Sequence, residues 1–356
     1  MERAIKKVVR IGNKLIGGTN PILIQSMTNT DTKDIKNTVK QILALEALGC
    51  DIIRVSVKDL EDAYALKEIK KEIHIPLVAD IHYDLNLAIE AIKSGVDKVR
   101  LNPGNTKDMS QLEELVSHAK ENQVSIRVGV NSGSLPSDLK KTKEGMIEAA
   151  KRQIVLLENL GFNDIVLSFK SSDVNLMIDA NKLASETFNY PLHIGLTEAG
   201  VKEIGLIKSS IAIGYLLLNG IGDTIRVSLT ADPIEEVKAA KEILRNLGII
   251  NDGPLFTSCP TCGRTEYDMI PIANKVYEYL NQTNKNVHVA VMGCVVNGLG
   301  EAKDADIAIV GSKKEILVYQ NNILINKIPN LAESKEEKNI TANNVVLELK
   351  KLIENY

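Results

Sequence analysis

Three of the four cysteines have a spacing that can bind a metal. Cys259 and Cys262 form a C-P-T-C motif, and Cys294 follows about thirty residues later in G-C-V-V-N-G-L-G-E. Glu301 ends this second motif and adds a carboxylate, which makes a set of four ligands with one weak position. Structural zinc sites normally use four Cys or His ligands, whereas Cys supplies most attachment points of an iron-sulfur cluster. The spacing favours a [4Fe-4S] cluster, and a three-cysteine zinc site completed by His288 or Glu301 stays open.

A set of cations lies in segments that are otherwise apolar: Arg54, Arg100, Arg127, Lys170 and Arg226. Strand alternation puts several of them on one face with a second polar residue, in the pairs Arg54 with Ser56, Arg100 with Asn102, Arg127 with Asn131 and Arg226 with Ser228. Charged side chains are seldom buried unpaired, and arginine suits bidentate contact with phosphate oxygens. The set therefore predicts a diphosphate or a similar polyanion as the substrate. The alternative is that each cation pairs with a neighbouring Asp or Glu.

Three titratable residues belong to the same segments and could transfer protons: Asp80, His82 and Glu198. Asp80 and His82 stand two residues apart in an expected strand, so they share a face. Glu198 is a carboxylate among cations, and it could instead only balance their charge. We therefore treat all three as candidate catalytic residues.

These residues need a scaffold that brings the ends of several segments together. Between residues 21 and 247 the chain alternates short β-branched runs with amphipathic stretches of helical period. The expected strands are 21–27, 51–57, 76–82, 98–102, 125–131, 164–170, 191–198 and 223–230. Eight βα units predict a (β/α)8 TIM barrel over residues 21–248, with its active site at the carboxyl ends of the strands. A doubly wound open sheet is the main alternative.

Other segments flank the expected barrel. Residues 1–20 hold a Gly-Asn turn between apolar runs, which predicts a hairpin packed on the barrel floor. Residues 249–258 resemble a linker, and residues 259–356 a smaller α/β domain. Within that domain we expect helices over about 268–281 and from about 342, and a hairpin around Q-N-N. The polar run at 333–339 is expected to be a solvated loop.

Composition restricts the function classes. A formal net charge of -3, no Trp and four Phe argue against a nucleic-acid binder. The longest apolar run, 211–218, is too short to cross a bilayer, and the first residues lack the apolar region of a signal peptide. Few cysteines and a C-x-x-C motif indicate metal chemistry in a reducing compartment, so we expect a cytoplasmic protein. The fourth cysteine, Cys50, is expected to be a buried thiol.

Taken together, these motifs resemble the 4-hydroxy-3-methylbut-2-enyl diphosphate synthase family. The most specific segments are Q-S-M-T-N-T-D-T (25–32), R-L-N-P-G-N (100–105), T-S-C-P-T-C-G-R (257–264) and M-G-C-V-V-N-G-L-G-E (292–301). The resemblance implies a two-domain bacterial type, with a small sulfite-reductase-like α/β iron-sulfur domain after the barrel. It implies that Cys259, Cys262, Cys294 and Glu301 hold the cluster. The cations with Asn131 and Ser228 would then bind the diphosphate.

The resemblance also implies a reaction. In that family 2-C-methyl-D-erythritol 2,4-cyclodiphosphate undergoes two-electron reductive ring opening with loss of water, and reduced ferredoxin or flavodoxin supplies the electrons singly. Glu198 is then the candidate proton donor for the departing hydroxyl. Two other functions stay open, a zinc-stabilised pterin-synthase-like transferase and a phospholigand or redox sensor.

The linker predicts an assembly. The eighth helix runs antiparallel to the strands, so the chain leaves the barrel at its floor, opposite the cations. Ten residues span at most roughly 35 Å when fully extended, which is barely the barrel's height. We therefore expect a head-to-tail homodimer in which each cluster domain caps the barrel of the other subunit.

Overall fold

The computed structural model describes residues 3–81, 84–101, 109–331, 334–354 and 356. The chain divides into two compact units, Met1–Leu247 and Gly248–Tyr356. Within the described ranges, no helix combines the length and the apolar character needed to span a membrane. Each unit has its own sheet and its own core, and each is described separately below.

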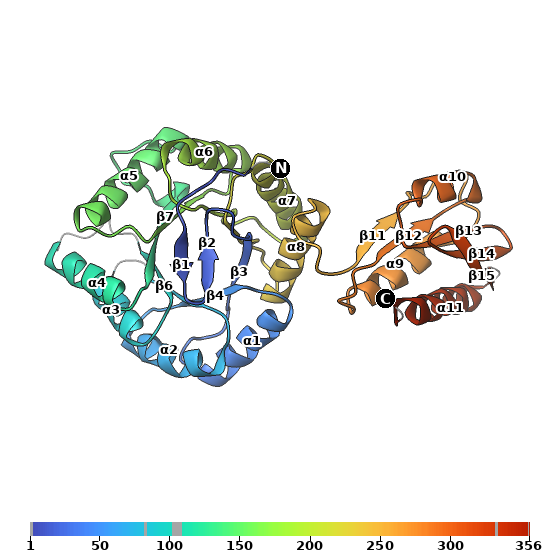
Figure 1. Ribbon diagram of the computed structural model, residues 1–356, viewed down its shortest axis with the longest axis horizontal. Helices are drawn as coiled ribbons and strands as arrows, with labels where there is room; N and C mark the ends of the chain where they lie inside the picture. Colours follow the sequence, from blue (N-terminus) through green and yellow to red (C-terminus); the bar gives the residue numbers. More distant parts are fainter. Residues whose placement is uncertain (1–2, 82–83, 102–108, 332–333, 355) are drawn as a thin grey trace. The chain divides into compact units, whose positions relative to one another are not determined.

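The first unit is a barrel of parallel strands (Figure 1). The strands are β3 (Leu23–Met27), β4 (Ile52–Ser56), β5 (Leu77–Asp80), β6 (Lys98–Leu101), β7 (Ser125–Asn131), β8 (Ile165–Lys170), β9 (His193–Ile194) and β10 (Thr224–Ile225). They pair in the order β8-β7-β6-β5-β4-β3-β10-β9. The Leu167 N–H of β8 donates to the carbonyl of Pro191 at 2.9 Å, and Leu167 bridges Leu192 in parallel. These contacts join the two ends of the sheet, so the predicted TIM barrel is confirmed and the open sheet is wrong.

A helix follows each barrel strand, and the helices form the outer ring in Figure 1. They are α1 (Ile35–Ala47), α2 (Leu60–Glu72), α3 (Leu85–Lys93), α4 (Met109–Glu121), α5 (Lys143–Asn159), α6 (Val174–Thr187), α7 (Lys202–Leu218) and α8 (Pro233–Asn246). The start of α8 shows how the sequence sets these boundaries. Pro233 occupies the first turn, where its missing N–H costs nothing, and the Asp232 carboxylate accepts the Ile234 N–H at 2.9 Å.

Strands β9 and β10 are much shorter than the segments 191–198 and 223–230 suggest. The backbone leaves the extended conformation directly after Ile194, because Gly195 has φ +154° and Glu198 has φ +53°. A Cβ at Gly195 would lie 2.2 Å from the carbonyl oxygen of Arg226, which no side chain tolerates. Close approach of these two chain segments therefore replaces regular pairing at this side of the barrel.

An antiparallel hairpin of β1 (Val9–Ile11) and β2 (Lys14–Ile16) precedes the barrel. Its buried side chains Val9, Ile11 and Ile16 form one apolar cluster with residues at the amino ends of barrel strands, Leu23, Ile52, Val78 and Val166. Figure 1 shows the hairpin in the middle of the ring of helices. The amino-terminal end of the barrel interior is therefore apolar.

The second unit is an α/β domain built on a five-stranded sheet in the order β11-β12-β13-β14-β15. Its elements are β11 (Leu255–Ser258), α9 (Met269–Leu280), β12 (His288–Met292), α10 (Val295–Glu301), β13 (Ile307–Gly311), β14 (Glu315–Gln320), β15 (Ile323–Pro329) and α11 (Lys335–Glu354). Residues 255–258, which we expected in a linker, form β11 and pair in parallel with β12. Asn321 and Asn322 adopt positive φ between β14 and β15, as the Q-N-N hairpin predicted.

The expected loop at 333–339 is wrong, because α11 begins at Lys335 rather than near residue 342. A capping box explains the earlier start. The Ser334 Oγ accepts the Glu337 N–H at 3.1 Å, and the Glu337 carboxylate accepts the Ser334 N–H at 2.9 Å. The run of charged residues that suggested a loop is the solvent-facing first turns of a helix.

The hairpin offers a test of how much the barrel floor contributes to stability. Ile11→Ala removes a fully buried side chain from the apolar cluster, and we expect it to lower the free energy of unfolding by about 2–4 kcal/mol. Leu15→Ala is the matched control, because Leu15 lies in the same hairpin and is 41% exposed. Urea unfolding followed by circular dichroism measures both variants. Equal losses in the two variants would contradict a packed floor.

Candidate active site

The cations predicted from the sequence lie in the barrel: Arg54, Arg100 and Arg127 lie within β4, β6 and β7, Lys170 ends β8, and Arg226 directly follows β10. Backbone register places Asp80, Arg100 and Arg127 opposite one another on β5, β6 and β7. Arg127 is 1% exposed and Lys170 is 7% exposed, while Arg226 is slightly more open. The structure therefore collects charged side chains from separate strands in one buried space, directly above the apolar floor.

These cations act on one another electrostatically. The pKa of Lys170 lies well below its ordinary value, first because the side chain is buried. The other causes are four positive neighbours: Arg226, Arg127, Arg54 and Arg100. Burial and then Arg54 lower the pKa of Arg226 to about 10. Burial is also the main reason that the pKa of Arg127 is lowered, followed by the charges of Arg54 and Arg100. The five residues therefore form one electrostatic site.

Two carboxylates balance part of this charge. Asp80 lies 3.8 Å from Arg54 Nε and 3.6 Å from Arg100 Nη1, and Glu236 of α8 lies 3.6 Å from Arg226 Nε. These distances exceed the 2.7–2.9 Å or so of a strong charge-assisted hydrogen bond. Among the described residues, Arg127 Nε and Nη1 are buried and have no hydrogen-bond partner. Pairing with neighbouring carboxylates therefore accounts for some of the cations, but the two Arg127 donors remain without an acceptor among the described residues.

Four interior residues were missed by the sequence analysis: Gln25, Lys98, His193 and Glu236. Lys98 is fully buried, and its Nζ donates to Gln25 Oε1 at 3.2 Å across the barrel. Burial, followed by the charges of Arg127 and Arg54, lowers the pKa of Lys98 well below its ordinary value. Alternation could have identified Lys98, because it stands two residues before Arg100 on the same face of β6. No comparable signal marks Glu236, which comes from a helix.

The remaining predicted barrel residues lie where strands end. Asn131 is the last residue of β7 and Ser228 follows β10, and both are half-buried. Glu198 is exposed in the segment between β9 and α7, with its backbone in the left-handed region that non-glycine residues rarely adopt. His82 and Asn102, which we also predicted, lie outside the described residues.

The cysteine motifs meet at the carboxyl ends of β11 and β12. Cys259 directly follows β11, and its N–H donates to the Val291 carbonyl at 3.0 Å. The Gly293 N–H donates to Cys259 Sγ at 3.0 Å, and a Cβ at Gly293 would lie only 3.1 Å from that sulfur. Cys294 is the next residue and caps α10. A glycine at 293 thus lets the second loop approach the first thiol.

All three thiols are free, and Cys262 is exposed. Glu301 is the last residue of α10, so it lies about 10 Å along the helix axis from Cys294. In the described part of the chain, no group of three Cys, His, Asp or Glu side chains is close enough to hold a metal ion. Cys50, by contrast, is buried in the barrel unit, and burial raises the pKa of its thiol to about 12, as expected for a structural cysteine.

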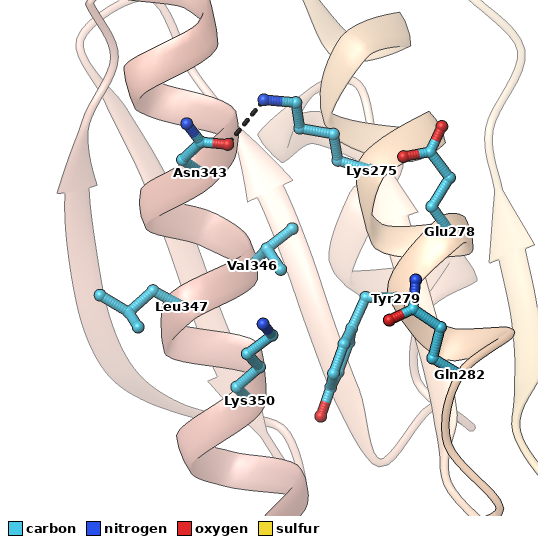
Figure 2. A pocket seen from close by; sticks show the side chains of 8 residues that line it. All are labelled: Lys275, Glu278, Tyr279, Gln282, Asn343, Val346, Leu347 and Lys350. Carbon is cyan, nitrogen blue, oxygen red and sulfur yellow. Dashed lines mark hydrogen bonds between the residues drawn. The ribbon is translucent and has the colours of Figure 1, made fainter.

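A hollow of about 400 Å³ lies between α9 and α11 in the second unit (Figure 2). Lys275 and Asn343 face each other there and bond at 2.6 Å, while Lys350 lies over the Tyr279 ring at 5.4 Å. This hollow contains none of the predicted site residues. We therefore place the candidate active site in the barrel and at the cysteine motifs.

Comparisons with known families give one match in the barrel unit and one in the C-terminal unit. Residues 6–241 match the GcpE TIM-barrel domain, and residues 255–353 match the GcpE protein C-terminal domain. The chain belongs to the GcpE family. It is 51% identical over 359 residues to a Clostridium perfringens protein named 4-hydroxy-3-methylbut-2-en-1-yl diphosphate synthase (flavodoxin), covering 99% of each chain. Proteins of the same name from Clostridium acetobutylicum and Caldanaerobacter subterraneus are 51% identical (100% of each chain) and 54% identical (89% of this chain, 91% of the relative).

Among solved structures, the chain resembles dihydropteroate synthase from Xanthomonas albilineans in complex with 7,8-dihydropteroate. The TM-score is 0.51 at 13% identity, over 68% of this chain and 97% of that one. The Stenotrophomonas maltophilia enzyme gives the same TM-score and identity, over 68% and 98%. At this identity the likeness shows the barrel fold alone.

The buried cations predict how anion binding depends on pH. A cation whose pKa is lowered loses its charge as the pH rises through that lowered value, so its attraction for an anion is lost there. We expect sulfate to bind more weakly at about pH 10 than at about pH 7, because sulfate does not titrate in this range, whereas the pKa of Arg226 is lowered to about 10 and the pKa of Lys170 is lowered from its ordinary value.

Isothermal calorimetry measures this dependence. Lys170→Met should weaken sulfate binding by about 10-fold or more at neutral pH and flatten the pH dependence. Lys67→Met is the control, because Lys67 is an exposed lysine on α2 of the same barrel. A pH dependence that survives in Lys170→Met unchanged would argue against this assignment.

Proposed function

We propose that this chain is an iron-sulfur oxidoreductase that acts on 2-C-methyl-D-erythritol 2,4-cyclodiphosphate. The reaction is a two-electron reductive ring opening with loss of water, which gives 4-hydroxy-3-methylbut-2-enyl diphosphate for isoprenoid biosynthesis. The observation that carries the proposal is the buried excess of cations in the barrel, in a chain that is 51% identical over its length to relatives named for this product. Reduced flavodoxin is the electron donor in the names of those relatives, and we propose it here over ferredoxin.

The barrel side chains hold the diphosphate in this proposal. Arg127 offers two buried donors that have no partner among the described residues, and the Lys170 side chain is buried among the same cations. A dianionic or trianionic ligand supplies acceptors for these donors and restores the charge that burial opposes. The same cations stabilise the negative charge that develops on phosphate oxygen when the ring C–O bond breaks. Arg54, Arg100, Arg226, Asn102, Asn131 and Ser228 complete the proposed substrate site.

We assign proton transfer to the three titratable residues Glu198, Asp80 and His82. Loss of water needs a proton on the departing hydroxyl, and Glu198 is the proposed donor because its exposed side chain stands in the loop after β9. Its backbone lies in the left-handed region, which costs a non-glycine residue free energy and often occurs at functional sites. Asp80 and His82 are the other proposed catalytic residues. Asp80 orients Arg54 and Arg100, whose guanidinium groups flank it at 3.8 Å and 3.6 Å.

The cysteine motifs fit an iron-sulfur cluster in their donor chemistry. Three free thiols and one carboxylate give four attachment points, and the N–H of Gly293 already donates to Cys259 Sγ, the kind of bond that tunes cluster sulfurs. We propose that Cys259, Cys262, Cys294 and Glu301 hold a [4Fe-4S] cluster. When bound, such a cluster supplies single electrons, which no side chain of the chain can store. The carboxylate of Glu301 would be the weakest of these four ligands, because the other three are thiolates.

Two other functions are less well supported. A zinc-stabilised transferase resembling pterin synthases shares the barrel fold, yet the likeness to dihydropteroate synthases reaches only 13% identity. A phospholigand or redox sensor would use the same cations and thiols without turnover. Neither accounts for full-length relatives named as a flavodoxin-dependent synthase.

Turnover and colour test the proposal together. Protein purified without oxygen is expected to be brown, with broad absorption near about 400 nm, and to convert the cyclic diphosphate with reduced flavodoxin or a chemical reductant. Cys259→Ser should lose both properties, whereas Cys50→Ala should keep both because Cys50 is buried in the barrel unit. A colourless protein that holds zinc after reconstitution with iron and sulfide would refute the proposal, and a brown protein without turnover would favour a sensor.

We also propose a head-to-tail homodimer, in which each C-terminal domain caps the barrel of the other subunit. An exposed apolar stripe supports dimer formation: Ile204, Ile207, Ile211, Tyr215 and Leu218 repeat at helical spacing along α7. A symmetric dimer uses the same patch on both subunits, and an apolar helix face of this size suits such a contact.

Mixing two inactive variants tests the shared site. Cys259→Ser leaves the barrel intact, and Arg226→Met leaves the cysteine motifs intact. If the sites are shared, random exchange should restore about a quarter of the wild-type activity, because half of the dimers then hold one complete site. A mixture of Arg226→Met with Lys170→Met should stay inactive. No recovery in the first mixture, with exchange proven by differently tagged chains, would show that each subunit works alone.

A further inference from the structure

His193 is a buried histidine in the barrel to which the proposed mechanism gives no role. It lies on β9, is fully buried, and pairs in register with Thr224 of β10. Its Nδ1 and the Thr224 Oγ1 are 2.8 Å apart. The other ring nitrogen, Nε2, is also buried and has no hydrogen-bond partner in the described part of the chain. A buried polar atom without a partner costs free energy, so Nε2 needs an explanation.

The surroundings of the ring are positive on several sides. Burial is the main reason that the pKa of His193 is lowered, and the positive charges that lower it further are Lys170, Arg127, Lys98 and Arg54. These residues come from β8, β7, β6 and β4, so the ring faces the barrel interior. His193 is therefore a neutral imidazole, with one donor and one acceptor nitrogen.

Electrostatics decides which nitrogen carries the proton. The Thr224 hydroxyl can donate or accept, so it fits either tautomer. The free end of the ring lies among cations, and a lone pair is favoured there over an N–H. The proton is therefore expected on Nδ1, where it is donated to Thr224 Oγ1. Nε2 then presents a lone pair to the barrel interior.

Lys170 is the charge that acts most strongly on this ring. It stands on β8, which closes the barrel by pairing with the segment that leads into β9. Leu167 of β8 and Leu192 form the bridge between them. The Lys170 side chain is 7% exposed, and no hydrogen bond or ion pair to it occurs among the described residues. The buried side chain of Lys170 and the buried Nε2 of His193, which has no donor among the described residues, thus lie on neighbouring strands.

We propose that His193 is a positioning residue: Nε2, which has no donor in the described part of the structure, accepts a hydrogen bond from the Lys170 ammonium when that side chain binds an anion, and so fixes the ammonium toward it. An ammonium has three donors, so two remain for oxygens of the anion. That this anion is a diphosphate rests on the proposed function. The pairing itself requires only that the barrel binds an anion.

Two variants separate the roles of the ring nitrogens. In His193→Gln the amide oxygen reaches the position of Nε2, whereas in His193→Asn the amide reaches only the position of Nδ1. We expect His193→Asn to weaken sulfate binding about 10-fold and His193→Gln to stay within about 3-fold of wild type. In a Lys170→Met background, His193→Asn should have no further effect, which a merely structural role would not predict. With the cyclic diphosphate, His193→Asn should raise KM while kcat changes less than about 3-fold.

Nitrogen NMR of the histidine side chain tests the tautomer in the wild-type protein, without relying on a variant that folds. The signal of a proton on Nδ1 supports the proposal, and a proton on Nε2 overturns it. Two results with sulfate would also overturn it. One is an equal loss of affinity in His193→Asn and His193→Gln, and the other is a loss caused by His193→Asn that is as large in the Lys170→Met background as in the wild type. Sulfate binding and the tautomer are measured without turnover. Failure of the cyclic diphosphate as a substrate would therefore refute the proposed function but not the proposed role of His193.

Discussion

Buried positive charge is the constraint that organises the barrel. Lys98, Arg127 and Lys170 are nearly inaccessible to water, and the charge of Arg127 adds to burial in lowering the pKa of both lysines. A protein interior accepts such charges only when pairing, hydrogen bonding or a ligand offsets their desolvation. The carboxylates that contact this set, Asp80 and Glu236, offset part of it. The free energy that holds the remaining cations in place must come from elsewhere in the fold.

The apolar floor is the source that the structure offers. The hairpin buries Ile11 and Ile16 against the amino ends of the strands, and this cluster excludes water from one end of the barrel. Closure of the sheet between Leu167 and Leu192 satisfies backbone groups that an open edge would leave to solvent. Stability therefore comes from the amino-terminal end of the strands and function from the carboxyl-terminal end, as in barrel enzymes in general.

The sequence predicted those features that follow from periodicity. Alternation identified Arg54, Arg100 and Arg127 as residues of one interior, because a strand repeats every two residues. It could not show that β9 ends after Ile194, since this depends on the approach of another segment to Gly195. His193 escaped notice because a single histidine in a two-residue strand carries no pattern. The start of α11 was missed although the Ser334 and Glu337 capping box was visible in the sequence.

Both units contain strong ligating groups that their own side chains do not fully use. The barrel has more buried donors and positive charge than its carboxylates can balance, and the cysteine motifs have one thiol fewer than a closed four-cysteine site. Each arrangement would be a defect in a protein that binds nothing, because both leave strong ligating groups incompletely used. Under the proposed function, the phosphate groups of the substrate supply acceptors for the unused donors of the barrel, and the three thiols with Glu301 would hold the cluster that supplies electrons.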